Sequence, residues 1–156
     1  MSTTQQLEAW AAKNISNFNF NGVYSADTLP QPQNITPKTC LIVNYDNHNK
    51  RGSHWVACCI DYNAVYWFDS FGLAPDADDL ILGHKTYFKE WLNNVCRNLN
   101  IKSYNYNTAD LQSLEATTCG HYSLWFCKNG WKNGWENFGP DREKNDLLIK
   151  QLVRLM

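Results

Sequence analysis

Apolar residues recur with helical spacing in residues 7–18, 87–99 and 141–156. Positions i, i+3, i+4 and i+7 share one face of a helix, so each stretch predicts an amphipathic helix that packs on a core. Thr3 or Thr4 would cap the first of these helices. The apolar positions are Leu7, Trp10, Ala11, Ile15 and Phe18 in the first stretch, Tyr87, Phe88, Trp91, Leu92, Val95 and Leu99 in the second, and Leu148, Leu152 and Leu155 in the third.

Short runs of β-branched and aromatic residues predict the strands of a sheet. Cys40–Asn44 (CLIVN) predicts a buried strand. Trp55–Ile60 and Val65–Phe68 are two further runs with a short connection, so together they predict a β-hairpin. Residues 101–106 alternate in polarity and predict another strand, whereas the glycine and prolines of residues 20–33 predict an ordered loop.

The segment TTCGHYSLWFC, residues 117–127, follows a polar loop and predicts a largely buried helix. The elements therefore follow in the order helix, strands, helix, strand, helix, helix, which is typical of an α+β fold. No repeat, low-complexity tract or linker-like stretch divides the sequence. We expect one domain that spans residues 1–156.

The composition supports a core and argues against two classes of partner. With 44% hydrophobic and 14% aromatic residues, a chain of 156 residues can bury one sizeable core. The 14 basic and 15 acidic residues nearly cancel, which argues against a nucleic-acid footprint or a membrane-surface patch. The N-terminus is polar, and no run approaches the roughly 20 apolar residues of a membrane span. We expect a soluble protein of a reducing compartment.

The sequence contains six cysteines. Disulfides are rare in reducing compartments, and a free cysteine in an apolar run behaves as a small hydrophobic residue, so we expect most of them to be core residues. These are Cys40, Cys58, Cys59, Cys96 and Cys127. A zinc site composed of His54, Cys58, Cys119 and His121 would lack the Cys-x-x-Cys spacing that is typical of such sites, and we expect no metal and no cofactor.

Cys119 stands apart because it falls at the predicted start of the buried helix. Thr117 and Thr118 precede it as capping residues, and Gly120 follows. The unpaired N–H groups of a helix start carry partial positive charge, which favours a thiolate over a thiol. A glycine next to the sulfur leaves room for a substrate carbonyl. We therefore predict Cys119 as a nucleophile.

His54 and Asp69 lie at the two ends of the predicted hairpin. His54 precedes the first strand and Asp69 follows the second, so the hairpin would bring both side chains to one edge of the sheet. A carboxylate there can fix the tautomer and orientation of the imidazole, which then serves as a general base and later as a general acid. The pair predicts the rest of a nucleophilic site around Cys119.

Gln112 completes the predicted site. It lies in the polar loop before Cys119, where its side-chain amide and the backbone N–H of Cys119 would form an oxyanion hole. Taken alone, each of these residues has an ordinary interpretation: a core cysteine, a core or surface histidine, a turn aspartate and a solvated loop glutamine. Their combination predicts acyl-transfer chemistry.

The motifs GSHWVA, WFDSFG and LQSLEATTCGHYSLWFC, in this order, resemble the adenovirus-type maturation protease and its relatives, the cysteine proteases that cut SUMO and ubiquitin-like proteins. The resemblance implies a papain-like cysteine protease architecture: an α+β fold with a central mixed sheet, flanking helices and the nucleophile at a helix N-terminus. It implies the same roles for Cys119, His54, Asp69 and Gln112.

The resemblance also implies a substrate cleft. Trp55 would cover the chain just before the scissile bond and so favour glycine there, and Gly120 would contact the substrate; an ordinary core tryptophan is the alternative. His121 lies two positions after Cys119 and therefore faces another side of the helix, so we interpret it as structural or substrate-lining.

Two branches of the family remain open. Asp69 is the acid that the SUMO-protease branch uses, whereas Phe71 in DSFG and the length of 156 residues favour the viral branch. We expect a viral cysteine endopeptidase, of adenovirus, virophage or polinton-like type, that cuts capsid and core precursors at glycine-containing sites during virion maturation. It would act as a monomer on polypeptides in the virion and inside the host cell, with an activating peptide or DNA left open. A SUMO or ubiquitin-like isopeptidase and a catalytically silent peptide-binding module are the alternatives.

Overall fold

A mixed sheet forms the centre of the protein. The computed structural model describes residues 2–46, 54–77 and 86–156, and within them a five-stranded sheet has the order β1-β2-β3-β4-β5. The outer pairs β1/β2 and β4/β5 are parallel, and the inner pairs β2/β3 and β3/β4 are antiparallel. The strands are β1 Asn19–Ser25, β2 Thr39–Asn44, β3 Trp55–Ile60, β4 Val65–Phe68 and β5 Asn105–Tyr106.

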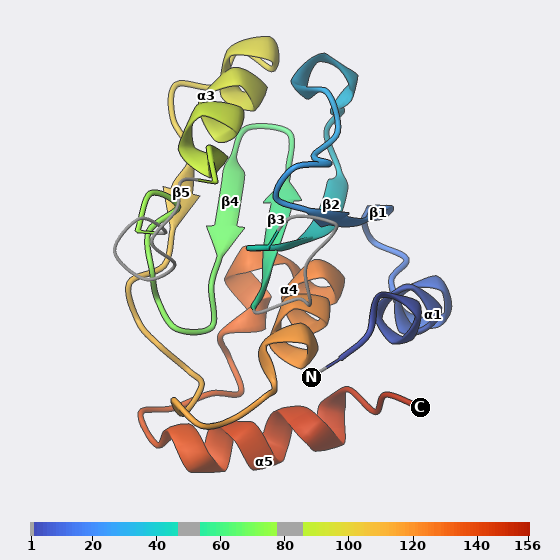
Figure 1. The fold of residues 1–156 in the computed structure, drawn as a ribbon, viewed down its shortest axis with the longest axis vertical. Helices are drawn as coiled ribbons and strands as arrows, with labels where there is room; N and C mark the ends of the chain where they lie inside the picture. The colour runs from blue at the N-terminus through green and yellow to red at the C-terminus, as the bar shows by residue number, and fades with distance from the viewer. Residues whose placement is uncertain (1, 47–53, 78–85) are drawn as a thin grey trace.

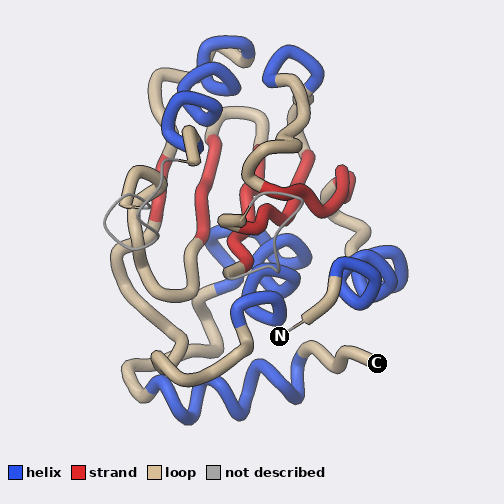
Figure 2. The backbone as a smooth tube through the Cα atoms, in the orientation of Figure 1, coloured by secondary structure: helices blue, strands red, loops and turns tan. Residues whose placement is uncertain are grey.

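Helices cover the sheet on both faces (Figure 1), and the strands lie side by side between them (Figure 2). The helices are α1 Thr4–Asn14, α3 Phe88–Asn98, α4 Cys119–Gly134 and α5 Arg142–Leu152, with a short 3-10 turn, η1, at Pro32–Asn34. No helix of the described residues has the length and apolar content needed to cross a bilayer. The arrangement is the predicted α+β fold.

Both faces of the central strands are buried. Cys40 and Ile42 of β2 belong to one core with α1, α4 and α5, the α4-side core, whereas Leu41 and Val43 belong to a second core with α3, the α3-side core. Every residue of β2 and β3 is buried. A strand that is covered on both faces needs apolar residues at every position, which explains why these runs are continuous rather than alternating.

The predicted hairpin and the predicted β2 strand are confirmed. β3 pairs antiparallel with β4 from Ala57 opposite Phe68 to Ile60 opposite Val65. The first helix is also confirmed, although it begins earlier and ends at Asn14. Thr3 is its N-cap, and its side chain accepts a hydrogen bond from the backbone of Gln6 in a capping box.

The prediction of a loop over residues 20–33 is wrong in its first part, because β1 occupies Asn19–Ser25. This outer strand mixes three apolar residues with asparagine, glycine and serine, and its register shifts between Phe20 and Gly22, where φ of Gly22 is 148°. The bulge interrupts any period-2 pattern, and the pairing depends on the backbone of β2 rather than on side chains. Sequence patterning therefore had no signal for it.

Two other predictions are correct in kind and wrong in detail. The strand expected over residues 101–106 is limited to Asn105–Tyr106. In α5 and the residues that follow it, Leu148, Leu152 and Leu155 are only half-buried. The fully buried face consists of Asn145, Asp146, Ile149 and Val153. Polar residues are inside here because they bind a loop, as described below.

The packing of α4 on the sheet determines where the site forms. Phe68 of β4 stacks on Phe126 of α4 with ring centroids 3.7 Å apart and an interplanar angle of 15°. α4 also packs along β3, and its first residue, Cys119, lies beside the first residue of β3, where the backbone N–H of Trp55 points to Sγ at 3.5 Å. The core thus brings the start of α4 to the edge of the sheet at which β3 begins.

Candidate active site

Three distant segments meet at this edge of the sheet. His54 immediately precedes β3, Asp69 immediately follows β4, and Cys119 begins α4. His54 Nε2 lies 2.8 Å from Asp69 Oδ1, and the Cys119 thiol is close enough to the ring to interact with it. Because Asp69 takes Nε2, the nitrogen available to the sulfur is Nδ1. The structure brings together the three residues that the sequence singled out, while Gly52 and Ser53 of the first motif lie outside the described residues.

The surroundings of His54 favour its protonated form. Burial lowers the pKa of the ring, but the charge of Asp69 and the hydrogen bonds to Asp69 and Cys119 outweigh it and raise the pKa from 6.5 to about 10. The ring stacks on Phe71 at 4.9 Å between centroids and meets the edge of Tyr45 at 5.1 Å. An imidazolium held in this way beside a sulfur stabilises a thiolate.

Asp69 is fully buried and fixed at both ends of its carboxylate. Oδ1 accepts from His54 and from the backbone N–H of Phe71 at 2.8 Å, and Oδ2 accepts from the Tyr45 hydroxyl at 2.6 Å. A buried charge needs such partners to offset the loss of hydration. The carboxylate is therefore held in one orientation toward the imidazole.

Asn107 fixes the backbone at Asp69. Its Oδ1 accepts from the Asp69 N–H at 2.9 Å, and its Nδ2 donates to the Asp69 carbonyl at 2.6 Å. Gly72, at φ 72°, closes the same turn with a hydrogen bond to Asp69 O. A Cβ on Gly72 would lie 2.5 Å from the carbonyl oxygen of Thr108. Sequence reasoning missed Asn107 and Tyr45 because single polar residues in loops carry no periodic signal.

Cys119 is 3% exposed and occupies the first position of α4. Thr118 is at the N-cap position, as predicted, but its side chain makes no capping hydrogen bond to the helix. Its hydroxyl donates instead to Asp146 Oδ1 at 3.0 Å. The first turn of the helix is thus left without a side-chain cap next to the sulfur, which keeps its N–H dipoles directed at this position.

Gln112 is 1% exposed, and its amide is held at both ends. Oε1 accepts from the hydroxyl of Ser70 at 2.6 Å, and Nε2 donates to the carbonyl of Ala116 at 2.7 Å. The Ser70 carbonyl also accepts from the backbone N–H groups of Leu111 and Gln112. Gln112, which we predicted as an oxyanion donor in a polar loop, is therefore internal and oriented, unlike the solvated glutamine of the alternative interpretation.

A second buried carboxylate organises the loop between Gln112 and Cys119. Asp146 of α5 accepts from the backbone and hydroxyl of Ser113 and from the hydroxyls of Thr118 and Tyr122, at 2.6–3.1 Å. Burial, followed by the hydrogen bond to Asp146 and its charge, raises the pKa of Tyr122, so this hydroxyl stays a donor. The sequence interpretation missed Asp146 because it treated α5 as a leucine-faced helix.

The two predicted substrate-binding residues both contact the N-terminal segment. The indole Nε1 of Trp55 donates to the Ser2 carbonyl at 3.1 Å, and the ring is 6% exposed. A Cβ on Gly120 would lie 2.9 Å from Ser2 Oγ and 3.1 Å from Leu7 Cδ2. In this structure the space beside Gly120 is thus filled by Ser2 and Leu7, and the substrate-binding roles stay predictions.

The hypothetical zinc set is not brought together. Cys58 belongs to the α3-side core, whereas Cys119 belongs to the α4-side core on the other face of the sheet. The six cysteines are all buried and free. His121 is half-buried, and burial and then the positive charge of Lys150 lower its pKa. Among the described residues, no cluster of three or more histidine, cysteine or acidic side chains has the geometry to hold a metal.

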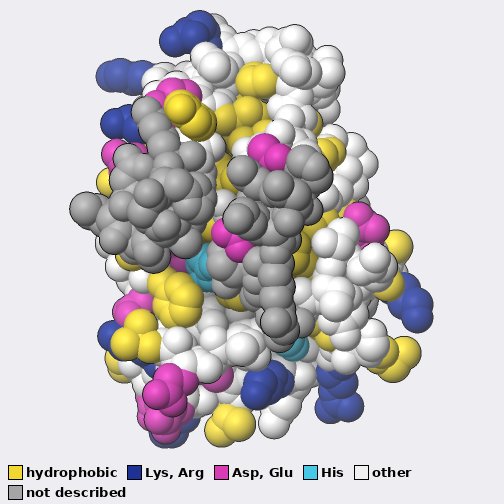
Figure 3. Space-filling view, viewed as in Figure 1, with side chains coloured by type: hydrophobic (Ala, Val, Ile, Leu, Met, Phe, Trp, Pro, Cys, Tyr) yellow, Lys and Arg dark blue, Asp and Glu magenta, His cyan; other side chains and the backbone are white. Residues whose placement is uncertain are grey.

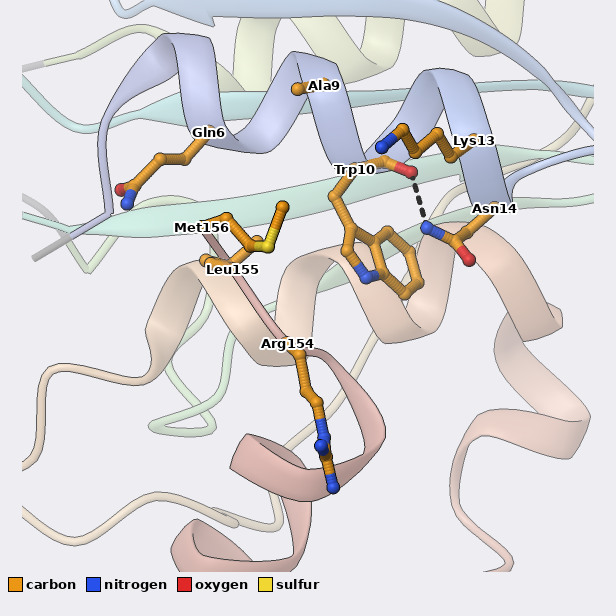
Figure 4. A pocket seen from close by; sticks show the side chains of 8 residues that line it. All are labelled: Gln6, Ala9, Trp10, Lys13, Asn14, Arg154, Leu155 and Met156. Atoms are coloured by element: carbon orange, nitrogen blue, oxygen red, sulfur yellow. Dashed lines mark hydrogen bonds between the residues drawn. The ribbon is translucent and has the colours of Figure 1, made fainter.

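Away from the predicted site, the described residues show a surface of mixed charge and a separate cavity. Acidic and basic side chains are interspersed over the face in Figure 3. A cavity of about 320 Å³ between α1 and the C-terminal residues is lined by Trp10, Lys13 and Arg154 among others (Figure 4). Its lining includes none of the predicted site residues. The predicted site residues lie instead at the edge of the sheet where β3 begins.

Comparisons with known proteins find a likeness in structure but none in sequence. No protein-family model matches the chain, and no curated protein sequence matches it. The crystal structure of the ASFV pS273R protease is similar, with a TM-score of 0.49 and 20% sequence identity over 76% of this chain. The match covers 44% of that protease, so the chain spans less than half of its length.

Proposed function

We propose that this protein is a thiol-dependent peptidase in which Cys119 is the nucleophile. The observation that carries the proposal is the buried arrangement of thiol, imidazole and carboxylate, in which His54 contacts Cys119 and lies 2.8 Å from Asp69. Nucleophile, base and orienting acid come from three separate segments of the chain. A core cysteine without a catalytic role has no need of an imidazole that a fully buried carboxylate holds in place.

The proposed reaction proceeds in two acyl-transfer steps. The Cys119 thiolate attacks the carbonyl carbon of the scissile bond, and the backbone N–H of Cys119 and an N–H of Gln112 Nε2 stabilise the oxyanion. The His54 imidazolium gives its proton to the departing amine, the C–N bond breaks, and a thioester remains. The now neutral ring takes a proton from water as that water attacks the thioester, which releases the acid and restores the thiolate–imidazolium pair.

The natural substrate is the more specific part of the proposal. We propose polypeptide precursors of a viral particle, cut after glycine, inside the host cell and the virion. The support is the resemblance of the His-Trp, Asp-Ser-Phe-Gly and Cys-Gly motifs to adenovirus-type maturation proteases. An isopeptidase acting on SUMO-like conjugates is the competing possibility, and Asp69 is the residue that favours it.

A peptide probe tests the peptidase proposal. A glycine-terminated peptide vinyl sulfone should label the wild-type protein at Cys119, and His54→Ala should slow labelling by about 100-fold or more, since general-base contributions are typically of this size. Cys96→Ser removes a cysteine of the α3-side core and should leave labelling unchanged. Equal labelling of the wild type and His54→Ala would exclude an activated thiol.

Cleavage assays separate the two substrate classes. Candidate capsid precursors and SUMO conjugates are each incubated with wild type and with Cys119→Ala, and the products are identified by mass spectrometry. We expect new C-terminal glycines in the precursors only with the wild type. Cleavage of the conjugates alone would instead assign the isopeptidase function.

A further inference from the structure

Ser70 lies between the two halves of the candidate site. It follows Asp69 directly in the chain, and it is fully buried. Its hydroxyl donates to Gln112 Oε1 at 2.6 Å, and its carbonyl accepts from the N–H groups of Leu111 at 2.8 Å and Gln112 at 3.2 Å. The turn that carries the orienting acid is thus bonded to both the backbone and the side chain of the predicted oxyanion donor.

The direction of the Gln112 amide matters for the chemistry. The oxygen and nitrogen ends of a primary amide have nearly the same shape, and hydrogen bonds decide which end faces a given group. The Ser70 hydroxyl donates to Oε1, while Nε2 gives one hydrogen to the carbonyl of Ala116. In the flipped amide, Oε1 would face the Ala116 carbonyl, and two acceptors would oppose each other.

Only one orientation of this amide can assist acyl transfer. With Nε2 held toward Ala116, the amide keeps a second N–H that can donate to a developing oxyanion. A flipped amide would present a partially negative oxygen to the same negative charge. The Ala116 carbonyl, which can only accept, selects the orientation of the amide, and the hydrogen bond from Ser70 anchors its Oε1 end so that the second N–H stays in place.

We propose that Ser70 is a positioning residue for the reaction, acting through Gln112 by fixing its amide with the N–H end available to the oxyanion. The inference rests on the proposed peptidase function. It assigns the serine of DSFG a role in transition-state stabilisation, in addition to its place in the turn after Asp69. Ser70 itself does not touch the substrate.

The central test is a double-variant cycle on peptide cleavage. We expect Ser70→Ala to lower kcat about 10- to 100-fold with little change in KM, since the loss of one oxyanion donor costs about 100- to 1,000-fold. In a Gln112→Ala background the same change should cost no more than about 3-fold, because its target is already absent. An undiminished effect of Ser70→Ala in that background would overturn the proposal.

A matched pair of variants controls for packing and folding. Thr and Val have nearly the same shape and differ at the hydroxyl, so Ser70→Thr should retain most of the activity that Ser70→Val loses. Equal activity of the pair would also overturn the proposal. Thr39→Val removes a buried hydroxyl at the far end of β2, where Thr39 pairs with Ile60, and should leave cleavage unchanged.

Alkylation by iodoacetamide distinguishes positioning of Gln112 from damage to the thiol. Displacement of iodide forms no oxyanion, so Ser70→Ala should alkylate Cys119 within about 2-fold of the wild-type rate, while cleavage falls. Parallel losses in both rates would mean that Ser70 acts through Asp69 and His54, against the proposal. A wild type without Cys119-dependent cleavage is a separate outcome, because it overturns the peptidase function itself.

Discussion

The hairpin that carries His54 and Asp69 and the loop from Gln112 to Thr118 meet at the same sulfur, but they are held in different ways. The hairpin is fixed by the backbone pairing of β3 with β2 and β4. The loop has no strand pairing: backbone hydrogen bonds to the Ser70 carbonyl anchor only its start, and the side chains of Ser70 and Asp146 hold the rest. Backbone hydrogen bonds between strands persist when side chains change, whereas each side-chain hydrogen bond is lost when one residue is replaced.

The largest expected effect falls on the hairpin side. Asp69→Asn keeps the shape of the side chain but removes the charge that favours the imidazolium, and we expect kcat/KM for peptide cleavage to fall about 10⁴-fold, as for a comparable substitution in a serine protease. The unfolding midpoint in urea serves as the control for folding. Retention of more than a tenth of the activity would mean that Asp69 does not orient His54.

The next effect tests the loop side. Asp146→Ala leaves the backbone of Ser113 and three hydroxyls without their acceptor, and since each unsatisfied buried donor costs about 1–3 kcal/mol, we expect a loss of about 3–5 kcal/mol in the free energy of unfolding. Activity of the folded fraction should fall as well, because Gln112 and Cys119 flank the loop. Asp141→Ala, at the exposed N-cap of the same helix, should cost only about 1 kcal/mol. Equal losses would contradict the difference between buried and exposed carboxylates.

The pH dependence of stability isolates the imidazole. His54 has a pKa of about 10 in the folded protein and 6.5 in the unfolded chain, so the folded state binds the proton more tightly. Its contribution is fully present below pH 6.5 and is lost as the pH rises toward 10, with a slope of up to about 1.4 kcal/mol per pH unit. Urea unfolding of wild type and His54→Gln across this range should reveal a decline that the variant lacks.

The smallest expected effect concerns Tyr45. Tyr45→Phe removes one donor from Asp69 Oδ2 but leaves the hydrogen bonds to His54 and Phe71, so the carboxylate keeps its orientation. We expect a loss of about 1–3 kcal/mol in stability and less than about 10-fold in kcat/KM. A loss as large as that of Asp69→Asn would show that the hairpin also depends on single side chains.

The difference between the strand-paired hairpin and the loop held by side chains also explains how much of the site could be predicted from the sequence. His54 and Asp69 were found because strand period and hairpin pairing place the two ends of adjacent strands together, and Cys119 because it precedes a buried helix. Gln112 was predicted from its place in the polar loop before Cys119 together with the other three residues, and the resemblance to known proteases implies the same role. β1 was not predicted because a bulge shifts its register, so its apolar residues do not alternate as in a regular strand.

The supports of the site could not be predicted in this way. Asp146, Asn107 and Ser70 are polar residues whose importance depends on partners 28 to 42 positions away in the chain. Hydropathy patterns record which residues are inside, but they do not record which donor meets which acceptor. Such pairs become visible only when the loops are placed in three dimensions.

The stacking of Phe68 on Phe126 has a practical consequence for engineering. Asp69 follows the first of these rings in the chain, and α4 carries both the second ring and Cys119. We therefore expect a change in the size of either ring to move α4 relative to the strands and to alter the separation of sulfur and imidazole. Variants selected for heat resistance at these positions would have to be screened for turnover at the same time, because the same interface contributes to the stability of the fold and to the spacing between the sulfur and the imidazole.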